Sequence, residues 1–99
     1  MVKVINESEF NDVIKEGNVV VDCFATWCGP CKMLGPILDN VSEELTDINF
    51  YKLDVDGAES IAKEYSIMSI PCILVFKEGK LDKKIVGLRS KDDLVNELK

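Results

Sequence analysis

The run of residues 19–25 constrains the fold more than any other part of the chain, because it is apolar except for Asp22. It begins with three valines, and a short apolar, β-branched run is typical of a strand that is covered on both faces. Such a strand lies inside a sheet that has helices above and below it. The sequence therefore predicts an α/β domain of three layers with this strand at the centre.

Strand and helix patterns alternate along the rest of the chain. The other strand candidates are residues 2–5, 48–55, 73–76 and 81–88. Helices are predicted after the cap pairs Asn6/Glu9 and Ser90/Asp93, after Pro30, and over residues 58–65. The resulting order β-α-β-α-β-α-β-β-α predicts a sheet that is mostly parallel at first and ends in an antiparallel hairpin.

Residues 81–88 carry the marks of an edge strand. Glu78-Gly79 predicts a tight turn before it, and the strand itself contains Asp82, Lys83 and Lys84. Charged side chains of this kind discourage pairing with a strand of another molecule. We therefore expect this strand at one edge of the sheet.

Composition limits the possible functions. The chain has 99 residues, 46% of them hydrophobic, which suits one domain spanning residues 1–99 with one modest core. The formal net charge of -6 argues against nucleic-acid binding, which needs clustered Lys and Arg. No basic leader precedes an apolar stretch, and no apolar run approaches the roughly 20 residues that span a bilayer. We therefore expect a cytoplasmic protein without a membrane partner.

Four cysteines, Cys23, Cys28, Cys31 and Cys72, are many for a chain of this length. They could form a disulfide scaffold, a metal site or a redox centre. A scaffold is disfavoured in a reducing cytoplasm. Zinc sites usually combine two Cys-x-x-Cys units or add His, whereas this chain has one such unit and no His, so no metal is expected. For Cys23 we expect plain core packing.

Cys28 and Cys31 lie between the apolar strand and the long helix that follows it. A helix N-terminus carries a partial positive charge that stabilises a thiolate, so Cys28 is the predicted nucleophile. Cys31 lies three residues further on the same helix face, deeper in the first turn, and could close a disulfide with Cys28, which makes it the predicted resolving thiol. The alternative is a pair of buried small apolar side chains.

Asp22 interrupts a stretch that is otherwise fit for complete burial. A buried carboxylate is costly unless it is paired or protonated, and burial raises its pKa toward the range useful for proton transfer. The alternatives are a half-exposed position on the strand or a structural ion pair.

With Asp22 and the motif Trp27-Cys28-Gly29-Pro30-Cys31, the chain resembles the thioredoxin family nearly end to end. Further matches are Pro36, Lys52, Ile70-Pro71, Gly79 and Gly87. The resemblance implies the thioredoxin fold, a central mixed five-stranded sheet flanked by four helices. It also implies a cis peptide before Pro71, placed so that a substrate strand can pair beside the two sulfurs. The substrate-binding residues would be Trp27, Gly29, Pro30, Ile70, Pro71 and Gly87.

The resemblance further implies that Asp22 accepts the proton of Cys31 and that Lys52 modulates Asp22. The expected activity is reduction of protein disulfides through a mixed disulfide, with electrons from a nicotinamide- or ferredoxin-linked thioredoxin reductase. No cofactor is expected beyond the redox-active disulfide Cys28–Cys31, and we expect a monomer. The alternatives are an oxidase or isomerase on the same fold, which the Gly29-Pro30 dipeptide disfavours, and a redox-inert binding module.

Four positions depart from the family pattern. Phe24 and the pair Met68-Ser69 are expected to alter only the shape and polarity of the docking surface. Cys72 stands where threonine is common, and its place beside the Pro71 loop puts a third sulfur within reach of the active pair. We expect Cys72 to be dispensable for reduction.

Overall fold

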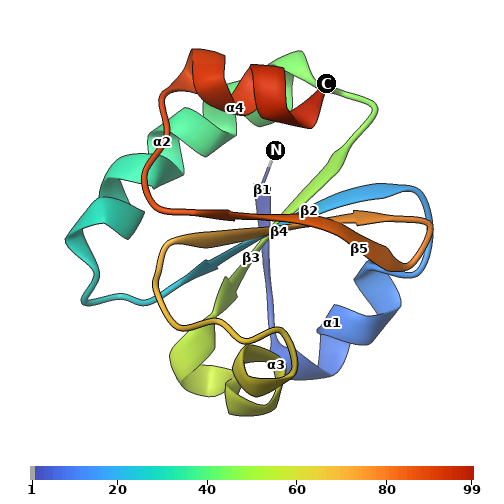
Figure 1. The fold of residues 1–99 in the computed structure, drawn as a ribbon, viewed down its shortest axis with the longest axis vertical. Helices are drawn as coiled ribbons and strands as arrows, with labels where there is room; N and C mark the ends of the chain where they lie inside the picture. Colours follow the sequence, from blue (N-terminus) through green and yellow to red (C-terminus); the bar gives the residue numbers. More distant parts are fainter. Residues whose placement is uncertain (1) are drawn as a thin grey trace.

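The computed structural model describes residues 2–99 and contains a single mixed sheet with helices on both sides (Figure 1). The strands are β1 (Val2–Ile5), β2 (Asn18–Phe24), β3 (Asn49–Asp54), β4 (Cys72–Lys77) and β5 (Lys80–Val86). The helices are α1 (Glu7–Val13), α2 (Gly29–Glu44), α3 (Glu59–Glu64) and α4 (Lys91–Leu98), with a 3₁₀ turn at Val55–Gly57. This is the element order predicted from the sequence.

The five strands are arranged in the order β1-β3-β2-β4-β5, so β2 is the central strand and β5 lies at an edge, as predicted. Strands β1, β3 and β2 are parallel, and β4 runs antiparallel to both β2 and β5. The sheet is therefore parallel on one side of β2 and antiparallel on the other. The carboxyl end of β2 leads directly toward the cysteine motif at the start of α2.

Alternating side chains of the strands build a core on each face of the sheet. On one face, Leu34 and Leu38 of α2 and Leu94 of α4 pack on Val20 and Ile73. The other face is covered by α1 and α3, and its buried residues include Phe10, Val19, Val21, Leu74 and Phe76. Figure 1 shows α2 with α4 on one side of the sheet and α1 with α3 on the other. The predicted three layers are confirmed.

Local signals mark where the elements begin and end, and one boundary differs from the prediction. Asn6 and Glu9 form a reciprocal capping box at the start of α1. The hairpin between β4 and β5 turns through Glu78 and Gly79, which both have positive φ. Strand β5 ends at Val86, two residues earlier than predicted, because Gly87 adopts a φ of 94° and its N–H donates to the carbonyl of Pro71 at 2.9 Å.

Two consecutive lysines of β5 reach helices on opposite faces of the sheet. Lys83 Nζ donates to the carbonyl of Glu97 in α4 at 2.7 Å. Lys84 Nζ donates to the carbonyls of Tyr65 and Ser66, just after α3, at 3.1 Å each. Both ammonium groups therefore satisfy carbonyls at a helix C-terminus.

Candidate active site

The cysteine motif lies at the junction of β2 and α2. Cys28 is the N-cap of α2, with an extended backbone, and its sulfur accepts a hydrogen bond from the backbone N–H of Cys31 at 3.2 Å. Cys28 and Cys31 form a disulfide whose Cα atoms are 5.3 Å apart. Gly29 and Pro30 are the first two residues of the helix. The alternative in which the two cysteines are merely separate apolar side chains is therefore wrong.

The Pro71 loop lies against the disulfide. The peptide bond between Ile70 and Pro71 is cis, as the resemblance implies, and the carbonyl oxygen of Ile70 is 3.8 Å from the sulfur of Cys28. Cys28 and Cys31 are 5% and 3% exposed, so both are buried in the disulfide form and Cys28 is only slightly the more open of the two. The two sulfurs differ in their neighbours instead. Cys28 faces the loop, and Cys31 lines a cavity that also contains Lys52.

Trp27 stands at the rim of the site and is 69% exposed. Its indole Nε1 donates to Asp56 Oδ2 at 2.9 Å, and the backbone N–H of Asp56 in turn donates to Asp54 Oδ1. This partner was not predicted, since 29 residues separate it from Trp27 and no local pattern links them. Asp56 holds the indole over the end of β3.

A groove of about 370 Å³ runs from Trp27 along α3 to the Pro71 loop. Its lining is mainly apolar and consists of Trp27, Val55, Ala62, Ile67, Met68 and Ile70, with Glu59 and Lys63 at its border. Met68 is 93% exposed. Gly87 lies behind the loop, where its N–H donates to Pro71. Of the expected substrate-binding residues, Trp27 and Ile70 therefore line one groove, and Pro71 is joined to Gly87 by a hydrogen bond.

Asp22 is completely buried, with 0% of its surface exposed, which excludes the half-exposed alternative. Within residues 2–99 neither carboxylate oxygen has a hydrogen-bond partner. Strand alternation places its side chain on the same face as Val20, beneath α2. Burial raises the pKa of Asp22 from 3.8 to about 6, and the positive charge of Lys52 acts in the opposite direction.

Lys52 is the register partner of Asp22 on β3. Its Nζ lies 5.0 Å from the centre of the Phe24 ring, within range of a cation–π interaction. The same Nζ would lie 3.5 Å from a Cβ atom added at Gly35 of α2. Phe24 therefore belongs to the lysine side of the disulfide, although the sequence predicts a role at the docking surface.

A cavity of about 260 Å³ lies beside Cys31 on this side. Its lining is formed by Phe24, Ala25, Thr26, Cys31, Lys32 and Lys52. Cys31 and Lys52, whose positive charge acts on Asp22, therefore border one space. The role of Phe24 here could not be read from the sequence, since it depends on the register between β2 and β3.

Cys23 and Cys72 are free thiols in the other core. They are register partners on β2 and β4 and are buried together with Leu74, which confirms the core packing expected for Cys23. Cys72 does not belong to the apolar cluster of Cys28 and Cys31, contrary to the expected third sulfur near the pair. Burial raises the pKa of both thiols, so they stay protonated.

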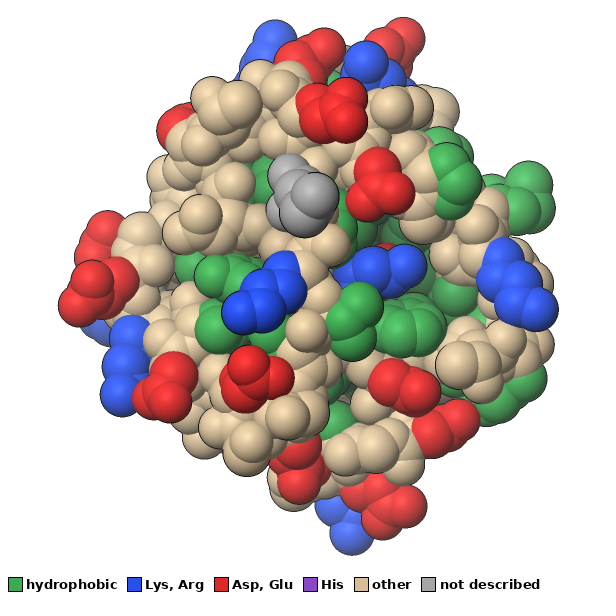
Figure 2. Space-filling model, turned by 180° about the vertical axis from the view of Figure 1, so that it is seen from behind, with side chains coloured by type: hydrophobic (Ala, Val, Ile, Leu, Met, Phe, Trp, Pro, Cys, Tyr) green, Lys and Arg blue, Asp and Glu red, His purple; other side chains and the backbone are tan. Residues whose placement is uncertain are grey.

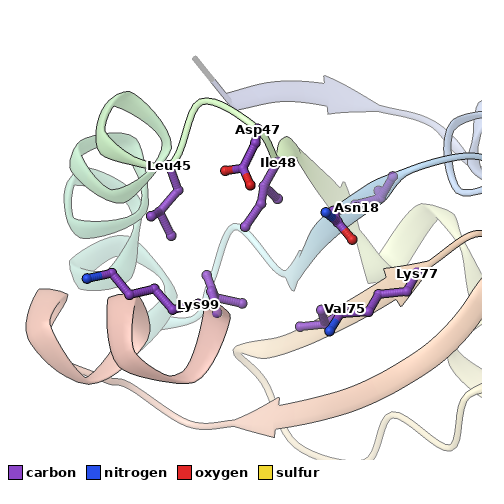
Figure 3. A pocket seen from close by; sticks show the side chains of 9 residues that line it. Asn18, Leu45, Asp47, Ile48, Val75, Lys77 and Lys99 are labelled. Carbon is purple, nitrogen blue, oxygen red and sulfur yellow. The ribbon is translucent and has the colours of Figure 1, made fainter.

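A separate hollow, of about 420 Å³, lies at the opposite end of β2 from the disulfide (Figure 3). Asn18 and Lys77 border it at the strand ends, and Leu45 and Ile48 line it from the connection between α2 and β3. Because Asn18 begins β2 whereas the disulfide follows its end, this hollow has no part in the site described here.

Three further observations concern possible partners. Among residues 2–99 no cluster of three or more His, Cys, Asp or Glu side chains is arranged to hold a metal ion. No helix in that range is both long and apolar enough to cross a bilayer. On the face in Figure 2, Lys and Arg side chains are interspersed with Asp and Glu rather than gathered into a basic patch.

The geometry agrees with three comparisons to known proteins. The family model for thioredoxin matches residues 1–99. A thioredoxin from Chlamydia trachomatis is 44% identical over 95 residues, which cover 96% of this chain and 93% of that protein. A thioredoxin from Mycoplasmoides gallisepticum is 42% identical over the whole of both chains. The crystal structure of thioredoxin from Malassezia sympodialis has a TM-score of 0.89 at 37% identity and covers 98% of this chain and 89% of its own.

The match in sequence over the whole chain and the likeness of fold to a solved thioredoxin thus point to the same family. This chain belongs to the thioredoxin family of thiol-disulfide oxidoreductases, which use their own active-site disulfide as the redox group.

Proposed function

We propose that this protein reduces disulfide bonds in target proteins through a covalent mixed disulfide, with Cys28 as nucleophile and Cys31 as resolving thiol. The observation that carries the proposal is the position of the disulfide, which joins the N-cap of α2 to its first turn beside the Pro71 loop. Free N–H groups and the helix dipole at this place stabilise a thiolate at Cys28.

The cycle begins with the dithiol form, after two electrons and two protons have reduced the Cys28–Cys31 bond. The Cys28 thiolate attacks one sulfur of the target disulfide, and the other target sulfur leaves and takes up a proton. Cys31 then loses its proton and attacks the sulfur of Cys28. The second target thiol is released, and the Cys28–Cys31 disulfide forms again.

Asp22 is the proposed acceptor for the proton of Cys31, and Lys52 is the proposed modulator of Asp22. Burial of Asp22 on the α2 side of the sheet supports this role, and so does its pKa of about 6, which suits proton exchange near neutral pH. Cys31 lines the same cavity as Lys52, the register partner of Asp22, which puts Cys31 on the side of the sheet where Asp22 is buried.

The target chain is proposed to lie across the Pro71 loop and the groove beside it. Main-chain groups of Ile70 would pair with an extended segment of the target, while Trp27 and the groove accept an apolar side chain. Gly29, Pro30 and Gly87 add little bulk around the sulfurs, which leaves room for an approaching backbone.

The proposed electron donor is a thioredoxin reductase, nicotinamide- or ferredoxin-linked, and the proposed location is the cytoplasm. The buried free thiols Cys23 and Cys72 support a reducing compartment, where thiols persist. We further propose that the protein acts as a monomer without nucleic-acid partners. Light scattering of the purified protein tests whether it is a monomer. Rate measurements with each class of reductase identify the electron donor.

Two matched variants test the roles of the cysteines. Cys31→Ser keeps the attacking thiol but removes the resolving one, so mixed disulfides with targets should accumulate after exposure to oxidised cell extract. Cys28→Ser should trap far fewer, because its remaining thiol lies on the side of Lys52 rather than the Pro71 loop. Non-reducing gels followed by identification of the bands measure both. Equal trapping by the two variants would overturn the assignment.

A disulfide-reduction assay with a generic protein substrate and a small dithiol tests the activity directly. The unaltered protein should accelerate reduction, and both serine variants should lose turnover. Acceleration that survives in the Cys28→Ser variant would show that the reaction does not pass through the proposed nucleophile.

A further inference from the structure

We propose that Phe24 is a positioning residue, whose ring holds the ammonium group of Lys52 in the cavity beside Cys31 and so fixes the charge that acts on Asp22. The inference rests on the proposed role of Asp22 as proton acceptor. It adds to that role the residue that keeps the modulating lysine in place.

The strands bring the three residues to one face. Phe24 lies two positions after Asp22 on β2, so strand alternation directs both side chains to the same side of the sheet. Lys52 is directly opposite Asp22 on β3. From this position its Nζ reaches the Phe24 ring, 5.0 Å from the ring centre.

Helix α2 closes the other side of the ammonium group. The absence of a side chain at Gly35 leaves space there, since a Cβ atom would stand 3.5 Å from Nζ. Within the described chain no carboxylate oxygen lies within 4.0 Å of this nitrogen. The Phe24 ring is therefore the attractive group that lies directly against the cation in the cavity.

The remaining surroundings of Asp22 supply little compensating charge. On β4 its register partner is the apolar Ile73. The first turn of α2 contributes Cys31 and the exposed Lys32 to the cavity. On the opposite face, the protonated thiols Cys23 and Cys72 are neutral. The position of Lys52 is therefore the variable that changes the electrostatic surroundings of Asp22 most.

An aliphatic side chain at position 24 would fill space without attracting a cation. Lys52 is only partly buried, so its flexible chain would then turn toward water. Asp22 would lose part of the charge that opposes the effect of burial, and its pKa would rise.

The direct test is a titration of the Asp22 carboxyl carbon by NMR in the oxidised protein, with the signal assigned by its loss in D22N. We expect K52M to raise the midpoint by about one pH unit and F24L to raise it by about half of that. F24Y, which keeps an aromatic face, should stay within about 0.2 units of the unaltered protein. The double variant F24L/K52M should titrate like K52M alone.

Two results would overturn the inference. One is an F24L midpoint that does not change, and the other is an F24L shift that persists undiminished in the K52M background, which would show an effect independent of the lysine. Should F24L fail to fold, F24M replaces it as the aliphatic variant.

A separate measurement distinguishes this failure from failure of the proposed function. The pH profile of disulfide reduction by D22N tests whether Asp22 takes part in proton transfer. An unchanged profile would show that Asp22 is not the proton acceptor, whereas the effect of Phe24 on the Asp22 titration would still hold. If the D22N profile changes but F24L leaves the Asp22 titration unaltered, the positioning role of Phe24 is wrong and the proton-acceptor role of Asp22 stands.

Discussion

Replacing Asp22 with Asn keeps the shape of the side chain but removes its charge, and it is expected to stabilise the folded protein in a pH-dependent way. Both carboxylate oxygens are buried without hydrogen-bond partners in the described chain, so the charged form gains little from its surroundings. The pKa of Asp22 is 3.8 in the unfolded chain and about 6 in the folded protein. Its protonated form is therefore favoured by folding.

The sign and size of the effect follow from this difference. Below pH 3.8 Asp22 is protonated in both the folded and the unfolded protein, and the free energy of unfolding is not reduced. As the pH rises from 3.8 through 6 the free energy of unfolding falls, and above that range the reduction stays constant. Two pKa units correspond to about 3 kcal/mol. Asn cannot ionise, so the variant should be more stable than the unaltered protein by about 3 kcal/mol at pH 8 and by only about 1 kcal/mol at pH 4.5.

Urea unfolding of the oxidised proteins at the two pH values measures the difference. With a slope of about 1–2 kcal/mol per molar for a chain of this size, the midpoint at pH 8 should rise by about 1.5–3 M. Asp39→Asn, an exposed change on α2, is the matched control, and it should not raise the midpoint more at pH 8 than at pH 4.5. A D22N gain that is equal at both pH values, or absent at pH 8, would refute a buried ionised carboxylate as the cause.

Three further outcomes are expected. Gly79→Ala should cost about 1–2 kcal/mol in thermal or urea unfolding, because Gly79 has a φ of 81° and an added Cβ would stand 3.1 Å from the carbonyl oxygen of Lys15, whereas Gly57→Ala, which meets nothing within 4 Å, should cost less than half as much. Equal losses would contradict the backbone explanation. Phe10→Ala should cost about 3–5 kcal/mol, since the ring is fully buried against those of Tyr65 and Phe76, and a loss below 1 kcal/mol in urea unfolding would be inconsistent with that packing. Cys72→Thr should keep the reduction rate within about twofold, because the catalytic cycle is complete with two sulfurs; a tenfold loss would implicate the third.

Much of the fold could be predicted because its main signals are local. The apolar run of β2 requires cover on both faces, and the capping pair Asn6/Glu9 marks where α1 begins. The charged residues of β5 indicate an edge before any pairing is known. These patterns depend on a few neighbouring residues, and the packed structure did not override them.

The parts of the site that escaped prediction all depend on pairing between distant segments. Trp27 and Asp56 meet only because the ends of β2 and β3 lie side by side. The meeting of Phe24 and Lys52 likewise requires the register of those two strands. No spacing within a single segment carries this information.

Cys72 illustrates a different failure. Its closeness to Pro71 along the chain suggests closeness to the disulfide, but strand alternation decides which face its side chain takes. Cys72 shares the face of Leu74 and Phe76, whereas Ile73 faces α2. Nearness in sequence was therefore a poor guide once the residue belonged to β4.

The contacts of Lys83 and Lys84 disfavour pairing of β5 with β4 in any register shifted by one residue. Moving β5 along β4 by one residue would exchange the faces of the two side chains, and each ammonium group would leave its helix end at the same time. A strand whose exposed residues are mostly charged gains little alignment from hydrophobic burial. In β5 the charged pair supplies that discrimination, so one alignment satisfies the helices on both faces together.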